Sequence, residues 1–191
     1  NGQQAVIYRA WTGGFPQVIF SEADTMGRMR SAPVPQMKRI PRKSLSEINL
    51  NALTAICLTA EEDQHLAKGV ALFNEGKYWH AHEAWEKIWQ KHAEDGRVFF
   101  QGLIQLAAAF HQCRRHIFRG FAVHLRQARE KLILFPGNFL GVNVSSLIDA
   151  IDANLLLIDR KKSFEEVDPS GIVIPYIQFR ENKTLSLEGD S

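Results

Sequence analysis

The stretch "LFNEGKYWHAHEAWEKIW", residues 72 to 89, decides the fold because it contains the end of one helix and most of the next. Before it, apolar residues recur at helical spacing from Ala60 to Glu75, and this helix is expected to stop at Gly76. The helical periodicity resumes at Tyr78 and continues to His92. Because only one or two residues link the two helices, they must lie antiparallel as a helical hairpin.

A second pair of helices follows with a similar spacing. Residues 97 to 116 form the most apolar predicted helix, and residues 121 to 135 form its partner after a break at 118 to 120. A further helix is expected over residues 145 to 161. We therefore predict an all-α fold: a compact bundle of about five helices built on two antiparallel, tetratricopeptide-like hairpins.

The flanking segments differ from this core in composition. Capping-box spacing of Ser44 with Glu47, and of Thr59 with Glu62, predicts helix starts at the N-terminal side of a helical domain over residues 44 to 163. Residues 1 to 43 are expected to be a flexible basic tail with several prolines, either a targeting remnant or read-through from an upstream region. Residues 164 to 191, interrupted by Pro169 and Pro175, are expected to form an extended strap and tail.

Charge and composition exclude several functional classes. The whole chain has a formal net charge of +2, and the basic residues concentrate before residue 46, so the folded part is slightly acidic and no nucleic-acid-binding face is expected. No apolar run reaches the ~18 residues of a membrane span, so we expect a soluble protein without a membrane partner. Cys57 and Cys113 are too few for a disulfide framework and are expected to be buried. We expect a cytoplasmic protein, or one of an organelle interior if the tail is a targeting remnant, and not a secreted one.

The helix that begins at Tyr78 also carries the candidate functional residues. His82, Glu83 and Glu86 are spaced three and four apart, which places them in one sector of the helix, with Trp85 and Trp89 beside it. On the apolar helix that follows, Gln101 and Gln105 are four apart, where glutamines need polar partners.

Three interpretations of this cluster are open. The side chains could form a buried polar network that fixes the helix register. They could bind a divalent metal ion, with His82, Glu83 and Glu86 as candidate ligands, joined by His80 or His111. They could also line a groove for a protein or a small molecule, together with the tryptophans and glutamines. His65, His92 and His124 have no ligand-spaced partners and are expected to be ordinary surface or interfacial residues.

The leading functional hypothesis is a binding or interaction module with this groove, and the alternative is a metal-dependent, hydrolase-like enzyme. The sequence offers no nucleophile elbow for covalent catalysis. It identifies no ligand, cofactor, partner or oligomeric state.

A resemblance to a known family rests on these same residues. The pattern is a Phe-x-x-Gly-x-Tyr turn, a His-Glu-x-x-Glu-x-x-Trp motif, an alanine-rich helix containing Leu-Ile-Gln, and a downstream glycine. It is matched by Phe73, Gly76, Tyr78, His82, Glu83, Trp85, Glu86, Trp89, Gln101, Leu103, Ile104, Gln105, Ala107, Ala108 and Gly120. Over about residues 60 to 135 the chain resembles the family called domain of unknown function 309. The resemblance implies an all-helical domain with a polar motif on facing helices, and no assigned activity. The stretch "RRHIFRG", residues 114 to 120, departs from the expected Arg-Gly-Asn type of turn.

Overall fold

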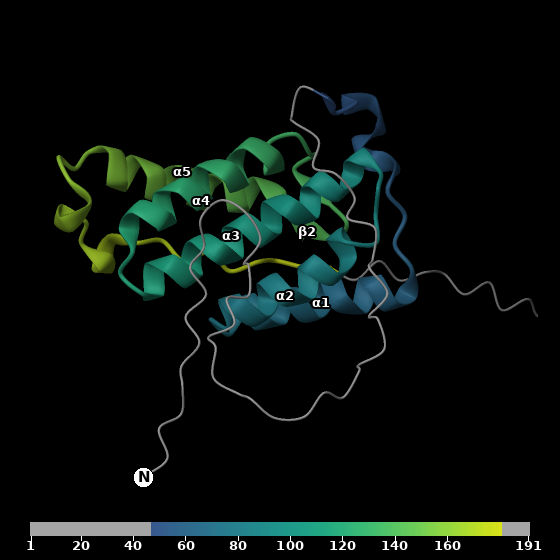
Figure 1. Ribbon diagram of the computed structural model, residues 1–191, viewed down its shortest axis with the longest axis horizontal. Coiled ribbons are helices and arrows are strands. Elements are labelled where there is room, and N and C mark those ends of the chain that lie inside the picture. Colours follow the sequence, from purple (N-terminus) through teal and green to yellow (C-terminus); the bar gives the residue numbers. More distant parts are fainter. Residues whose placement is uncertain (1–46, 181–191) are drawn as a thin grey trace, which may run out of the picture. The chain divides into compact units, whose positions relative to one another are not determined.

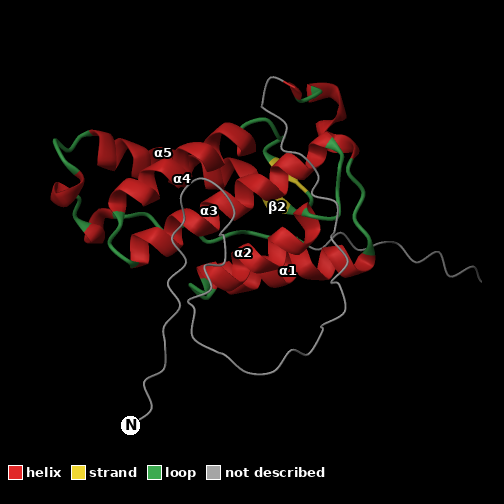
Figure 2. Ribbon diagram, viewed as in Figure 1, coloured by secondary structure: helices red, strands yellow, loops and turns green. Residues whose placement is uncertain are grey.

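The computed structural model describes residues 47–180, which all lie in the second of two units of the chain, residues 1–37 and 38–191 (Figure 1). The predicted tail of residues 1 to 43 lies outside the described residues. Within them the fold is all-α, as predicted, and helices predominate in Figure 2. The five α-helices are α1 (Ala60–Asn74), α2 (Tyr78–Trp89), α3 (Val98–Arg114), α4 (Phe118–Leu132) and α5 (Val144–Asp159).

The α-helices pack in the order of the chain, with α3 at the centre. Figure 1 shows α1 and α2 on one side of α3, and α4 and α5 on the other. Apolar side chains cover almost the whole circumference of α3, which explains its central position. At one end of the core, aromatic rings from four helices meet edge to face or tilted; they are Phe73, Tyr78, Trp85, Phe110 and Phe121. Such ring pairs stabilise the fold beyond the area they bury.

The two hairpins have the same three-residue link. After α1, Gly76 adopts a left-handed conformation (φ +74°), and the N–H of Lys77 donates to the carbonyl of Leu72 over 2.8 Å. After α3, His116 adopts the same conformation (φ +57°), and the N–H of Ile117 donates to the carbonyl of Gln112 over 3.0 Å. Both links are Schellman motifs, in which a left-handed residue satisfies the last carbonyls of a helix. The predicted break at 118 to 120 was therefore wrong, because α4 already begins at Phe118.

Each hairpin also has one close approach between helices at a glycine. A Cβ atom on Gly69 of α1 would lie only 2.6 Å from Cδ1 of Trp85, whose indole N–H donates to the carbonyl of Leu66 over 3.3 Å. A Cβ atom on Gly102 of α3 would lie 2.8 Å from Cγ of Leu132. The absence of a side chain at these two positions allows a large side chain of the partner helix to pack against the backbone.

Shorter elements close the ends of the bundle. Strands β1 (Asn138–Phe139) and β2 (Val142–Asn143) form a two-stranded antiparallel sheet between α4 and α5, with Phe139 opposite Val142. The 3-10 helices are η2 (Leu50–Ala55), η3 (Asp95–Arg97), η4 (Phe164–Glu166) and η5 (Pro169–Gly171).

Two asparagine side chains hold the segment of residues 172–180, which has no helix and passes from η5 to the small sheet. Asn154 of α5 binds both the N–H and the carbonyl of Val173, at 2.9 and 2.7 Å. Asn74, the last residue of α1, binds both backbone groups of Ile177 in the same way, at 2.8 and 3.0 Å. At its end, Phe179 forms an isolated antiparallel bridge with Val142. These contacts connect the segment to α1, α5 and β2.

The region before α1 differs from the prediction. Instead of an α-helix started by Ser44, the described part contains the 3-10 helix η2, whose N-cap is Asn49. Ser44 itself lies outside the described residues, whereas the capping box of Thr59 and Glu62 is present as predicted. Cys57 is exposed and Cys113 is half-buried, so the expectation that both thiols are buried was wrong. None of the helices in residues 47–180 combines the length and the apolarity needed to cross a membrane.

Candidate functional site

His82, on the second turn of α2, is the most buried polar residue of the predicted cluster. It is 6 % exposed, and its Nδ1 atom makes no hydrogen bond. The nearest carboxylate oxygen, Oε2 of Glu86 one turn further along α2, lies 3.8 Å from that nitrogen, which is too far for a hydrogen bond. A buried nitrogen without a hydrogen bond costs about 1–3 kcal/mol, so its presence needs an explanation.

The surroundings of His82 keep its imidazole neutral. Burial lowers its pKa to about 4, and the nearby His111 and His124 act in the same direction. The ring of Trp79 stacks on that of His82 with centroids 5.1 Å apart and an interplanar angle of 8°, and it also contacts His111 at 5.7 Å. At neutral pH this group of rings offers hydrogen-bonding nitrogens rather than positive charge.

A second buried histidine, His124 of α4, faces the same region. Its Nδ1 lies 2.8 Å from Oε1 of Gln105, and burial lowers its pKa to about 4. Of the two expected places for His124, surface or interface, the structure has it at the interface of α3 and α4, where it is 5 % exposed and partners a predicted site residue. The burial of His124 could have been predicted, because it lies next to Leu125 on the amphipathic helix α4. The search for pairs of residues at metal-ligand spacing did not detect it.

A row of half-buried polar side chains runs along α3 between these two histidines. Gln101, Gln105 and Gln112 follow helical spacing on one face, and we call them the polar row. Gln105 is held by His124, whereas Oε1 of Gln112 is buried without a hydrogen-bond partner. Two buried polar atoms, on His82 of α2 and on Gln112 of α3, thus lack hydrogen bonds, and the side chain of Gln112 lies beside Gly120 of α4.

The structure separates the remaining predicted site residues. Glu83 is exposed while His82 is buried, so these two side chains lie in different surroundings although they are neighbours on α2. Trp85 is completely buried in the core between α1 and α2 and therefore lines no accessible groove. Trp89 is also buried, and the guanidinium of Arg97 lies 4.9 Å from the centre of its ring.

The predicted metal ligands do not converge. Of the candidate carboxylates only Glu86 lies near His82, and His80 is exposed. Within residues 47–180, no three His, Cys, Asp or Glu side chains are placed to hold a metal ion together. The geometry of the described residues thus gives the metal interpretation no ligand set.

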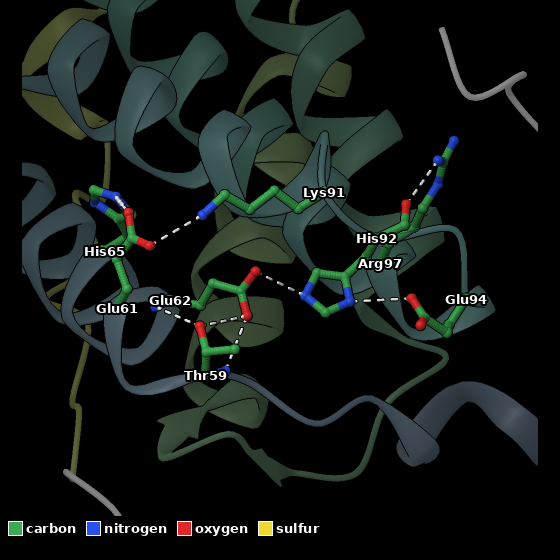
Figure 3. A network of polar contacts seen from close by, with 8 residues as sticks. All are labelled: Thr59, Glu61, Glu62, His65, Lys91, His92, Glu94 and Arg97. Atoms are coloured by element: carbon green, nitrogen blue, oxygen red, sulfur yellow. Dashed lines mark hydrogen bonds and ion pairs between the residues drawn. The ribbon is translucent and has the colours of Figure 1, made fainter. Parts of the chain in front are cut away.

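A separate polar network, which sequence reasoning missed, joins the start of α1 to the end of α2 (Figure 3). Glu62 is 4 % exposed; it accepts hydrogen bonds from the N–H and the hydroxyl of Thr59 at 2.9 and 3.0 Å, and its other oxygen lies 3.3 Å from Nε2 of His92. Nδ1 of His92 lies 3.0 Å from the carboxylate of Glu94. His92, expected to be an ordinary surface or interfacial residue, therefore links two carboxylates.

The contacts within this network lower the pKa of Glu62 and keep its carboxylate charged. Burial alone would raise the pKa of Glu62, but the hydrogen bonds from Thr59 and the charge of His92 outweigh it and hold that pKa below its usual value. Arg97 donates to the carbonyl of His92 over 3.0 Å, which fixes the turn after α2. The oxygen of Glu62 that faces Thr59 is satisfied within the fold, whereas Nε2 of His92 lies at ion-pair distance from Glu62 and makes no hydrogen bond. This network therefore connects α1 to the end of α2.

The central helices are similar to a known protein family. Residues 66–123 match the model of the family described as Domain of unknown function (DUF309). Residues 66–123 of the chain are thus similar to this family. This confirms the resemblance that the motif on α2 predicted. A search of curated proteins finds no match.

The matched region contains the motif of α2 and the polar row of α3. It extends from Leu66 in α1 to Val123 in α4, which is shorter than the predicted extent of about 60 to 135. His82 and the whole polar row lie within it, whereas His124 is the first residue beyond it. Glu62, which anchors the separate network, lies before it. The matched region therefore coincides with the cluster around His82 more closely than with the network of Figure 3.

Proposed function

We propose that the matched region of this protein, residues 66–123, is a binding module, and that its ligand contacts His82 of α2 and the polar row of α3. The observation that carries this proposal is the buried Nδ1 atom of His82, which has no hydrogen-bond partner. A fold retains such an atom at a cost in stability, and a ligand that supplies the missing hydrogen bond accounts for it.

The chemistry of the surrounding groups specifies the kind of ligand. Since the pKa values of His82 and His124 are both about 4, neither imidazole carries a charge at neutral pH. Oε1 of Gln112, also without a partner, can only accept a hydrogen bond. These groups suit an uncharged polar ligand with a hydrogen-bond donor, such as an amide or a short peptide backbone, and Trp79 adds apolar contact area.

The alternative, a metal-dependent hydrolase-like enzyme, has no comparable support. It needs several ligands converging near His82, and within residues 47–180 no three His, Cys, Asp or Glu side chains do so. We therefore place a binding role ahead of a catalytic one.

NMR spectroscopy of the histidine side chains tests the proposal directly. Uniformly ¹⁵N-labelled protein is titrated with a library of small amides and unbranched tripeptides, and the ring nitrogens of His82 and His124 are followed. We expect hits that shift the resonances of both rings, and we expect the shifts of His124 to disappear in His82→Phe. His80→Phe, which changes an exposed histidine on the same helix, should bind as the parent does.

Two outcomes would contradict the binding role. Hits that shift only other parts of the protein would move the binding site elsewhere. If no library member binds, and His82→Phe raises the melting temperature because it removes the unsatisfied nitrogen, the cluster is a tolerated packing defect.

A further inference from the structure

The ends of the two hairpins form a surface that the polar row does not include. The guanidinium of Arg114 donates to the carbonyl of Gly76 over 2.6 Å, which places the link after α3 beside the link after α1. Exposed side chains from the second link and the start of α4 gather there. We call this surface the arginine end, and it consists of Arg114, Arg115, Ile117, Arg119 and Val123.

The positive charge of the arginine end is not neutralised by the described part of the chain. From Gly96 to Arg129 the sequence contains no Asp or Glu. Within residues 47–180, no carboxylate lies within ion-pair distance of Arg114, Arg115 or Arg119. In contrast, Arg126 and Arg129, further along α4, pair with Asp159 and Asp152. Guanidinium groups without a carboxylate are available for bidentate binding of one.

Two further observations point to an anionic partner. The N-cap residues of α2 and α4, Lys77 and Ile117, make no side-chain capping hydrogen bond, so the first N–H groups of two helices face this end uncapped. In addition, the pKa of His111 is lowered, first by burial and then by the charges of Arg115 and Arg114. The positive field of the arginines thus acts on a neighbouring group and is not cancelled locally.

The apolar side chains decide which class of anion fits. Ile117 is 40 % exposed and Val123 is 43 % exposed, and Val123 lies one turn beyond Arg119 on the same face of α4. A protein segment that combines carboxylates with an apolar side chain would cover both features. A nucleic acid would leave the apolar groups Ile117 and Val123 uncovered, and the exposed ring at this end is that of His116, because Tyr78 is buried and Trp79 is stacked on His82.

We infer that the arginine end docks an acidic, partly apolar segment of a partner protein. This surface is separate from the polar row, and its charge distinguishes its ligand from the uncharged ligand proposed there. Arginine is one of the residues enriched in protein interfaces, and charge complementarity of this kind accelerates association and makes binding sensitive to salt.

Fluorescence anisotropy with the full chain tests the inference. The probes are a fluorescein-labelled peptide of glutamate and leucine, the same peptide with glutamine in place of glutamate, and a polyuridine oligonucleotide. We expect the acidic peptide to bind, the neutral peptide to bind at least about tenfold more weakly, and the affinity to fall as salt is added.

A pair of charge-matched variants locates the binding. Arg115→Glu combined with Arg119→Glu should weaken the acidic peptide by about tenfold or more. Lys68→Glu combined with Lys87→Glu makes the same change in net charge at exposed positions of α1 and α2 and should have a much smaller effect. Circular dichroism melting curves check that all variants are folded.

Three results would overturn the inference. Equal weakening by both double variants would mean that only the overall charge attracts the peptide. Tighter binding of polyuridine than of the acidic peptide would make the arginine end a nucleic-acid surface. Equal affinity for the neutral and the acidic peptide would show that the carboxylates are not recognised.

Discussion

The two helical hairpins have the same link but differ in what they bury. In both, one left-handed residue ends the first helix in a Schellman motif, and the next helix begins two residues later. In both, the second helix carries one buried histidine, His82 in α2 and His124 in α4. Nδ1 of His124 has Gln105 as its partner, whereas Nδ1 of His82 has no hydrogen bond. The comparison teaches that the same scaffold can bury a histidine with a hydrogen-bond partner in one copy and without one in the other. The two positions do not correspond, because His82 follows its left-handed residue by six residues and His124 by eight.

The largest expected effect is on stability in acid. The pKa of each buried histidine is about 4 in the folded protein, below the usual 6.5, so the unfolded chain binds more protons between these values. The stabilising contribution is therefore complete above about pH 6.5 and is lost as the pH falls towards 4. We expect each histidine to cost about 2 kcal/mol between pH 7 and pH 5, as measured by urea unfolding at both values.

Variants separate the two histidines from the carboxylates that also titrate in acid. His82→Phe and His124→Phe should each reduce the loss of unfolding free energy between pH 7 and pH 5. His80→Phe, which alters an exposed ring, should leave that loss unchanged. If His82→Phe has no larger influence than His80→Phe, the burial of the His82 ring is wrong.

The side chain that packs against a glycine is held more rigidly in the first hairpin than in the second. Gly69→Ala places a Cβ atom against the indole of Trp85, which is held by its hydrogen bond to Leu66, so we expect a loss of about 2–3 kcal/mol. Gly102→Ala meets the more adaptable side chain of Leu132, and the better helix propensity of alanine offsets part of the cost, so about 1 kcal/mol is expected. Urea unfolding of both variants gives the difference, and a greater loss for Gly102→Ala would contradict this interpretation.

The start of the first hairpin depends on a cap that the second lacks. Thr59→Ala removes both the cap of α1 and a hydrogen bond to the buried Glu62, so we expect a loss of about 1–2 kcal/mol. The control is Thr54→Ala at an exposed position of η2, which should change thermal stability little. Equal melting temperatures for the two variants would show that the network of Figure 3 does not depend on the cap.

Local sequence signals predicted the helical part of the fold. Gly76 and the capping box of Thr59 mark helix ends through the conformation of single residues, and both were read correctly. The start of α4 was misplaced because His116 occupies a position that usually requires glycine. The structure shows that this histidine is exposed and that its ring contacts Phe118.

The cluster around His82 could be predicted only in part. Helical spacing identified His82, Glu86 and Gln105 from their places on α2 and α3. It could not show that Trp85 enters the core, since that depends on the glycine at position 69 of another helix. It also missed His124 and His92, because their partners lie 19 and 30 residues away in the chain. Contacts of this range are set by helix packing and leave no periodic signal.

The smallest expected effects come from exchanging the left-handed residues of the two links. Gly76→Ala forces a Cβ atom into the left-handed region and should lower the unfolding free energy by about 1 kcal/mol. His116→Gly removes the corresponding strain but gives the unfolded chain more freedom, so a gain of no more than about 1 kcal/mol is expected. Paired urea titrations measure both changes. His116 is also exposed, so a loss on His116→Gly would mean that its ring contact with Phe118 stabilises the link by more than the left-handed backbone costs. The similarity of the two links would then be one of geometry alone, with the first held by the freedom of its glycine and the second by side-chain contact.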